Sequence, residues 1–404
     1  MSEWRKLPLK EITVKIGSGS TPTGGSGAYK ETGVSLIRSQ NVLDFSFTNN
    51  GLAFIDEEQA HALRNVIVEP QDVLLNITGD SVARCCSAPR EWLPARVNQH
   101  VAIIRAHPKH LDSLFLKYSL ISIKDELLSL SEIGGTRNAL TKSMLENLKL
   151  FVPSVIEQKA IASVLSSLDD KIDLLHRQNK TLESMAETLF RQWFDVDSND
   201  EWQEKNVLDI FTLVGGGTPK TSVAEYWTDE IPWISGGDIS AAHQGYLYST
   251  EKSISLAGLQ NSSAKLLPKN STVISARGTV GKYALLARDM AFSQSNYGIV
   301  SKIGSYPFFI YLLVGFIVDD LLTAAYGSVF DTITTRTFES VNLKFPSLNS
   351  IEKFNEEISP IFSKKETNTQ QIKTLENLRD TLLPKLMNGE VRVQYAEEAI
   401  ASVA

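Results

Sequence analysis

The sequence predicts an α+β protein built from two tandem copies of one domain, each followed by a long helix. The order of sequence features in residues 1–194 recurs in residues 202–388. Within each copy, short apolar runs separated by turn residues precede helical segments, which is typical of α+β domains. Each copy then ends in a heptad pattern, which predicts a long amphipathic helix.

The first long helix is predicted from Ser154 to Phe194. Pro153 precedes it, and Ser154 and Glu157 have the spacing of a capping box. The apolar stripe of this predicted helix follows alternating steps of four and three: Ile161, Leu165, Leu168, Ile172, Leu175, Asn179, Leu182, Ala186, Leu189 and Trp193. The alternative to a helix that pairs with another is a long surface helix packed on its own domain. Asn179 is the polar member, and a buried amide in such a stripe fixes the register of paired helices.

The second long helix is predicted over residues 350–388. Pro384 disrupts its last turn, and Asn388-Gly389 supplies a left-handed C-cap. Its stripe consists of Phe354, Ile358, Ile361, Lys365, Asn368, Ile372, Leu375, Arg379, Leu382 and Leu386. We expect the two helices to pair as an antiparallel coiled coil about 40 Å long, because each residue adds about 1.5 Å. The two domains would then be related by a pseudo-twofold axis.

These features divide the chain into six regions. They are a first domain (1–153), a first long helix (154–194), a linker (195–201), a second domain (202–349), a second long helix (350–388) and a C-terminal tail (389–404).

The internal repeat can be followed segment by segment. A glycine-rich run leads to Thr21-Pro22 in one copy and to Thr218-Pro219 in the other. The other matching pairs are residues 34–42 with 231–239, 70–79 with 268–278, and Asn98–Ile104 with Gln294–Val300. Such self-similarity indicates two related domains in one chain.

Composition excludes several classes of protein. The net charge of −7 argues against a uniformly basic nucleic-acid coat, although local basic faces remain possible. The two cysteines, Cys85 and Cys86, are adjacent, so no ordinary structural disulfide is expected, and a reducing cytoplasm suits the chain. Residues 1–10 lack an apolar signal core. The most apolar run, Phe308 to Val318, is too short to span a membrane and ends at Asp319-Asp320.

Motifs for catalysis or cofactor binding are weak. Gly215-Gly216-Gly217 is not followed by the Lys-Ser/Thr of a P-loop and lacks dinucleotide-fold spacing. A turn whose backbone approaches DNA phosphate, or a plain surface turn, fits it equally well. His100, His107 and His110 do not have the one-face spacing of a zinc site, because Pro108 separates the last two. We take them as surface or DNA-facing residues.

Several fragments, in this order and twice, resemble the specificity subunit of type I restriction–modification systems over nearly the whole chain. They include Thr218-Pro219, residues 231–238, Arg277-Gly278, residues 152–161, residues 189–194 and residues 382–390. Residues 36–40 depart from the form seen at 231–238, which blocks transfer of residue roles there. The resemblance implies that each domain recognises one half of a split DNA target and that the helices bind partner subunits.

Candidate DNA-binding side chains are those able to contact phosphates or base edges. They are Thr21, Arg38, Asn41, Arg84, Asn98, Gln99, Arg137, Asn138, Thr218, Lys220, Asp238, Arg277, Lys282, Gln294, Asn296 and Arg336. For each of them a structural role, such as a cap or a turn, is the alternative. Candidate subunit contacts are Arg191, Trp193, Phe194, Leu382 and Leu386; Trp193 can equally be the last residue of the helix seam.

The resemblance also implies partners and cofactors. Double-stranded DNA, two methylation subunits and, through them, restriction subunits are the expected partners. No catalytic residue or metal site is expected in this chain, and S-adenosylmethionine, ATP and magnesium would be used by the partners. Two rival hypotheses are a fused dimer of active sites, for which no matched constellation is found, and a coiled-coil scaffold whose two domains bind protein.

Overall fold

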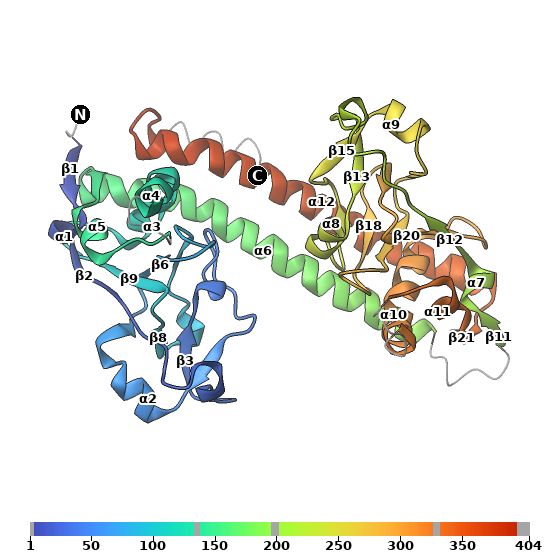
Figure 1. Cartoon of the computed structure of the whole chain (residues 1–404), viewed down its shortest axis with the longest axis horizontal. Helices are drawn as coiled ribbons and strands as arrows, with labels where there is room; N and C mark the ends of the chain where they lie inside the picture. Colours follow the sequence, from blue (N-terminus) through green and yellow to red (C-terminus); the bar gives the residue numbers. More distant parts are fainter. Residues whose placement is uncertain (1–3, 133–137, 195–201, 326–331, 394–404) are drawn as a thin grey trace. The chain divides into compact units, whose positions relative to one another are not determined.

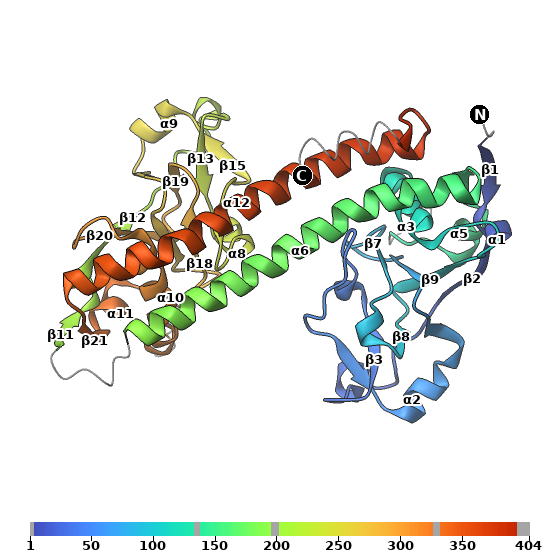
Figure 2. The same cartoon turned by 180° about the vertical axis from the view of Figure 1, so that it is seen from behind.

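The computed structural model describes residues 4–132, 138–194, 202–325 and 332–393. Two compact units are present: unit 1 comprises Met1–Asp173 with Lys373–Ala404, and unit 2 comprises Leu174–Ile372. Each unit therefore includes part of both long helices, whereas the sequence-based division treated each helix as a region of its own. Figures 1 and 2 show α6 and α12 each as one uninterrupted helix.

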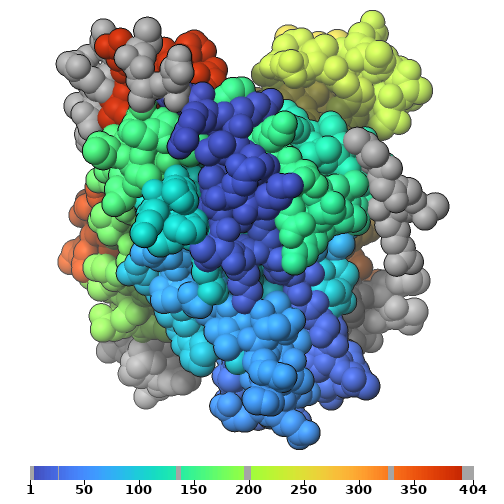
Figure 3. All heavy atoms as spheres, turned by 90° about the vertical axis from the view of Figure 1, so that its left-hand side faces the viewer, coloured from blue at the N-terminus to red at the C-terminus, as the bar shows by residue number. Residues whose placement is uncertain are grey.

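Unit 1 contains two four-stranded sheets and a two-stranded ladder. The ladder pairs β1 (Arg5–Pro8) with β10 (Lys149–Val152), and Figure 3 shows the N-terminal segment at the surface of this unit. One sheet has the order β2 (Thr13–Ser18), β9 (Val101–Ala106), β6 (Val73–Asn76), β7 (Cys85–Ser87). The other has the order β4 (Ala53–Ile55), β3 (Val34–Ile37), β8 (Ala95–Val97), β5 (Ile67–Val68). Its shorter helices are α1 (Leu9–Ile12), α2 (Glu57–Ala62), α3 (Ser113–Ser122), α4 (Lys124–Glu132) and α5 (Lys142–Asn147).

Unit 2 repeats this plan. A ladder pairs β11 (Gln203–Asn206) with β21 (Asn342–Phe345). One sheet has the order β12 (Phe211–Gly215), β20 (Asn296–Ser301), β17 (Thr272–Ser275), β18 (Tyr283–Leu286), β14 (Tyr246–Leu247). The other has the order β15 (Lys252–Ile254), β13 (Ile231–Ile234), β19 (Met290–Phe292), β16 (Leu266–Leu267). Its shorter helices are α7 (Val207–Ile210), α8 (Gly236–Ala241), α9 (Leu256–Gln260), α10 (Pro307–Ala325) and α11 (Thr335–Glu339).

Strand pairing corrects the sequence-based alignment of the two copies by one residue. The last residue of β6 pairs with Val101, and the last residue of β17 pairs with Asn296. Counting back two positions in each case makes Gln99 equivalent to Gln294. The sequence alignment had matched Asn98 to Gln294, because a run of short apolar residues carries little information about register.

Helix α10 is longer than the apolar run in the sequence suggested, because it continues through Asp319-Asp320 to Ala325. By length and composition alone it could cross a membrane, which corrects the expectation that no run reaches that length. Its buried face, which includes Phe309, Tyr311 and Leu313, packs in the largest core cluster of unit 2. The helix therefore serves as a core element of this domain.

Helix α6 (Val155–Trp193) begins at the predicted position. The backbone N–H of Glu157 donates to Ser154 Oγ at 3.3 Å, which is one half of the expected capping box. The Glu157 carboxylate accepts from the Trp4 indole at 3.3 Å. The side chain of Gln158, fully buried, bonds to the backbone of Asp112 and Pro153 and so attaches the first turn to its domain.

Helix α12 (Leu348–Met387) includes two prolines. Pro384 does not end the helix, since its carbonyl accepts from the Asn388 N–H at 3.0 Å. Gly389 has φ +75°, which confirms the left-handed cap predicted for Asn388-Gly389. Pro360, which the sequence analysis had not weighed, lies inside the helix and removes one backbone donor there.

Within each unit, a carboxylate of α6 joins α12 to a helix of the globular domain. In unit 1, Asp169 accepts from Tyr118 of α3 at 2.6 Å and from Arg379 of α12 at 3.2 Å. In unit 2, the buried Glu183 forms an ion pair with Lys365 of α12 and accepts from Tyr311 of α10 at 2.9 Å.

A second polar contact in unit 2 joins the amides that the two stripes carry. Asn368 Nδ2 donates to Asn179 Oδ1 at 3.0 Å, and Asn179 Nδ2 donates to Thr369 Oγ1 at 3.1 Å. Asn368 is fully buried. Since a buried amide needs a partner, this contact favours one helix register over its neighbours.

Candidate nucleic-acid interface

Loops from four parts of unit 1 meet at one end of its strands. The Asn98 N–H donates to the Ile37 carbonyl at 3.1 Å, which joins the loop before β9 to the end of β3. The Ile77 N–H donates to His100 O at 2.9 Å, and the Leu140 N–H donates to Ile77 O at 2.8 Å. The loop after β6 is thereby held between the loop before β9 and the segment that precedes α5.

Unit 2 has the same junction with different side chains. The Ser293 N–H donates to Ile234 O at 2.9 Å, the Ala276 N–H to Ser295 O at 2.9 Å, and the Ile333 N–H to Ala276 O at 3.0 Å. Each bond has a counterpart at the equivalent position in unit 1. Thus two sets of loops with a common backbone frame carry different residues.

One side-chain pair is common to both junctions. Thr21 Oγ1 donates to Gln99 Oε1 in unit 1, and Thr218 Oγ1 donates to Gln294 Oε1 in unit 2. Both glutamines are exposed and both threonines are half-buried. All four residues were candidates in the sequence, but their pairing across almost eighty residues required the folded chain.

Glycines bring each threonine to its glutamine. A Cβ at Gly19 would lie 1.7 Å from the Val97 carbonyl oxygen, and a Cβ at Gly216 would lie 2.4 Å from that of Phe292. These separations are far below van der Waals contact, so only glycine fits at either position. The run at 215–217 is predicted to be either a turn that approaches DNA phosphate or a plain surface turn, and within it Gly216 lies close to the chain's own backbone.

Four candidate residues have structural roles. Asn41 is buried, its Oδ1 accepts from Arg38 N–H at 3.1 Å, and its Nδ2 donates to the carbonyls of Thr48 and Asn50. Asp238, at the equivalent position, accepts from Ser235 N–H at 2.8 Å. Asn98 and Asn296 are also buried, with bonds to the turn backbone or to Ser293. For these four, the alternative of a cap or turn describes the folded state.

The basic candidates of the described residues lie in loops, except Arg336, which lies in α11. In unit 2, four are exposed: Lys220, Arg277, Lys282 and Arg336. In unit 1, Arg38 and Arg84 are half-buried, and the Arg38 guanidinium lies over the Tyr29 ring at 5.2 Å and donates to Gly51 O. Asn138 is exposed, and its carbonyl accepts from Gly79 N–H. Arg137 lies outside the described residues.

The sequence analysis missed Thr78, whose hydroxyl contacts His100 Nδ1. His100 Nε2 in turn contacts Gln99 Nε2 at 3.0 Å, so Thr78, His100 and Gln99 form one chain of polar contacts. The position of Thr78 in the repeat could have identified it, because Thr78 precedes Gly79 as the candidate Arg277 precedes Gly278.

Most of the residues predicted to contact other subunits are buried in their own chain. Phe194 belongs to the core cluster of unit 2, and Leu382 and Leu386 are buried in unit 1. Trp193 is half-buried against Phe354, with ring centroids 6.0 Å apart, as the seam alternative implied. Only Arg191 is exposed among the five.

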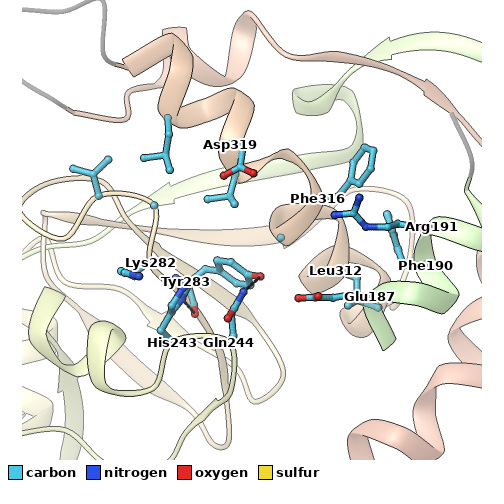
Figure 4. A pocket seen from close by; sticks show the side chains of 15 residues that line it. Glu187, Phe190, Arg191, His243, Gln244, Lys282, Tyr283, Leu312, Phe316 and Asp319 are labelled. Atoms are coloured by element: carbon cyan, nitrogen blue, oxygen red, sulfur yellow. Dashed lines mark hydrogen bonds between the residues drawn. The ribbon is translucent and has the colours of Figure 1, made fainter. Parts of the chain in front are cut away.

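A pocket of about 350 Å³ lies beside Arg191, inside unit 2 (Figure 4). Glu187 and Arg191 of α6 face His243, Lys282 and Asp319 across it. Burial and the Lys282 charge lower the pKa of His243, whose Nδ1 lies 3.4 Å from the Tyr283 amide nitrogen. Charges of both signs line the pocket, and no cluster of three or more potential metal ligands occurs among the described residues.

The fold and the junctions define a class: a protein with two related domains that present similar but non-identical loop surfaces. The sequence model of the "Type I restriction modification DNA specificity domain" matches residues 1–184 and 199–378. The chain therefore belongs to this family, whose domain occurs twice in it.

Individual relatives agree. The chain is 27% identical to the type I restriction enzyme MjaIX specificity subunit of Methanocaldococcus jannaschii, over 97% of this chain and 94% of the relative. It is 24% identical to the HindI specificity subunit of Haemophilus influenzae, over 64% of this chain and 72% of the relative. The fold is similar to the S subunit of the type I restriction–modification system of M. genitalium, with TM-score 0.59, 14% identity and coverage of 95% and 96%.

Proposed function

We propose that this chain is the DNA sequence-recognition subunit of a type I restriction–modification complex and that each domain reads one half of an asymmetric, two-part target. The observation that carries the proposal is the loop junction found in both units, with one backbone frame and different side chains. Because the loop backbones are alike in both units, both domains can bind the same kind of ligand, double-stranded DNA. Because the side chains differ, each domain can recognise a different base sequence.

The long helices, in this proposal, form an antiparallel coiled coil that sets the gap between the two half-sites. Three contacts support it: Asp169 with Arg379 in unit 1, and Asn179 with Asn368 and Glu183 with Lys365 in unit 2. Residue numbers rise along α6 while they fall along α12, which is the order of an antiparallel pair.

The proposal assigns no catalytic step to this chain. Two methylation subunits, and restriction subunits recruited through them, would supply methyl transfer and cleavage, and S-adenosylmethionine, ATP and magnesium would be bound there. The complex would act in the cytoplasm, where its DNA is. Arg191, exposed beside the pocket of unit 2, is the residue of the predicted subunit contacts that remains available to such a partner.

Selection from a random duplex pool tests the function. The chain is assembled with its methylation subunits, bound duplexes are recovered and sequenced, and binding is repeated at two salt concentrations, because phosphate contacts weaken with salt. Recovery of two short motifs at a constant gap supports the proposal. A scaffold that binds only protein would enrich no motif, and that outcome would overturn it.

A further inference from the structure

The strongest unassigned feature is the threonine–glutamine pair that occurs once in each unit. The pair is the same in both domains, although the residues around it differ. Gln99 and Gln294 lie in the loops that precede equivalent strands, β9 and β20, and both side chains are exposed. A contact kept in two diverged copies, at the end of exposed loops, needs a reason that both domains share.

The hydroxyl contact restricts what each glutamine can offer. A carboxamide has one acceptor oxygen and an NH₂ group with two donors. The threonine hydroxyl donates to one of the two lone pairs of that oxygen, which fixes the orientation of the carboxamide and leaves N–H groups for a ligand. In unit 2 no contact of Gln294 Nε2 is found among the described residues. In unit 1, Gln99 Nε2 contacts His100 Nε2 and keeps a second N–H.

Base edges differ in how they meet such a group. Adenine is read by asparagine or glutamine through both an acceptor and a donor, N7 and N6–H₂. An N–H donor matches adenine N7, guanine O6 and N7, and thymine O4, whereas cytosine presents its N4–H₂ donor and no acceptor in the major groove.

We propose that Gln99 and Gln294 are specificity-determining residues, each reading one position of its own half-site as an N–H donor, and that Thr21 and Thr218 are the positioning residues that hold the carboxamides in this orientation. The preferred partners are the bases that present an acceptor in the major groove, which disfavours cytosine. This inference rests on the proposed function and adds to it the residue and the class of base atom.

The neighbours explain how one shared pair can serve two different half-sites. In unit 1 the adjacent loop positions are Thr78 and His100, and in unit 2 the equivalent positions are Arg277 and Ser295. An arginine beside the donor group favours guanine, whereas a threonine and a histidine form a chain of polar contacts. Both domains therefore share the glutamine N–H donor, whereas the base preferred at the flanking position differs between them.

The test uses the full chain assembled with methylation subunits and the same duplex selection. Wild type is compared with Gln294→Ala, Gln294→Glu and Thr218→Val, with Gln203→Ala, an exposed glutamine on β11, as the matched control. Gln294→Ala is expected to lower base preference at one position of one half-site by about five- to tenfold, and to leave the other half-site and the gap unchanged. Gln294→Glu, which presents acceptors, should shift that position towards cytosine, whose N4–H₂ donates.

Thr218→Val keeps the shape of the side chain but removes the hydroxyl, so the carboxamide loses its fixed orientation and the base preference at the same position should weaken. Thr21→Val and Gln99→Ala should act in the same way on the other half-site only. A wild-type protein that selects no two-part motif would refute the proposed function. If wild type selects one and Gln294→Ala weakens binding to all sequences equally, or if the lost base is cytosine, the proposed function stands and this inference fails.

Discussion

Glu183 of α6 and Lys365 of α12 form a buried ion pair in unit 2, and the hydroxyl of Tyr311 donates to the same carboxylate at 2.9 Å. Both residues are less than 10% exposed. Two charges removed from water depend on each other, because the desolvation cost is recovered only while the pair is intact.

The single substitution Lys365→Met should therefore lower the free energy of unfolding by about 3–5 kcal/mol, since it leaves Glu183 as a lone buried charge. A triple variant that adds Glu183→Leu and Tyr311→Phe should recover most of this loss, because the lone carboxylate and its hydroxyl donor are removed together. Urea unfolding of wild type, the single variant and the triple variant measures both effects. A loss below about 1 kcal/mol in the single variant would show that the pair is effectively solvated.

Gly216→Ala should impair recognition of one half-site. The added Cβ would lie 2.3 Å from Ser293 O and 2.4 Å from Phe292 O, so the segment that carries Thr218 must move away from Gln294. Gly215→Ala is the control, because a Cβ there meets nothing within 4 Å.

The same comparison exists in unit 1, where Gly19→Ala is the test and Gly17→Ala the control. Equilibrium binding to a duplex carrying both half-sites should fall for the two test variants and stay near wild type for the two controls. Equal binding by Gly216→Ala and Gly215→Ala would mean that the glycine contact has no part in placing the threonine.

Unit 2 should lose stability in mild acid through His243. Burial and Lys282 depress the pKa of this imidazole below 6.5, so the unfolded chain binds the proton more tightly than the folded one. The resulting stabilisation is complete above pH 6.5 and declines as the pH falls from there through the lower folded-state pKa. Chemical unfolding followed between about pH 7.5 and 5.5 should show a smaller decline for His243→Gln than for wild type; parallel curves would contradict the assignment.

Lengthening the helices should lengthen the gap between half-sites. Seven residues inserted between Asp173 and Leu174 of α6, and seven between Ile372 and Lys373 of α12, preserve the heptad phase. The added length is about 10 Å, or about three base pairs at 3.4 Å each. Duplex selection reports the gap directly. Insertion into one helix alone should disturb pairing and binding, and an unchanged gap in the double insertion would exclude the helices as the measure of spacing.

Local patterns predicted the elements that depend on neighbours in sequence. The stripes from Ile161 to Trp193 and from Phe354 to Leu386 predicted both long helices, because apolar residues repeated every three to four positions lie on one face of an α-helix. Asn388-Gly389 predicted the left-handed cap for a similar reason, since few residues other than glycine adopt positive φ without strain. Pro360 shows the limit of such rules, as the surrounding packing retains a helix through it.

The candidate interface depended on contacts that no local pattern contains. Asn41 and Gln99 are both polar residues near strand ends, and the sequence proposed the same role for both. In the folded chain, Asn41 is buried and bonded to the turn backbone, whereas Gln99 is exposed and held by Thr21. The difference arises because burial is set by segments tens of residues away.

The sequence by itself thus determined that two related domains each end in a long amphipathic helix, since periodicity and repetition are properties of the order of residues. Only the tertiary structure decided which polar side chains cap turns, such as Asp238, and which reach solvent in matched pairs, such as Gln99 and Gln294. The physical reason is that a polar group takes the partner that folding brings within hydrogen-bond distance, and here that partner lies far away along the chain.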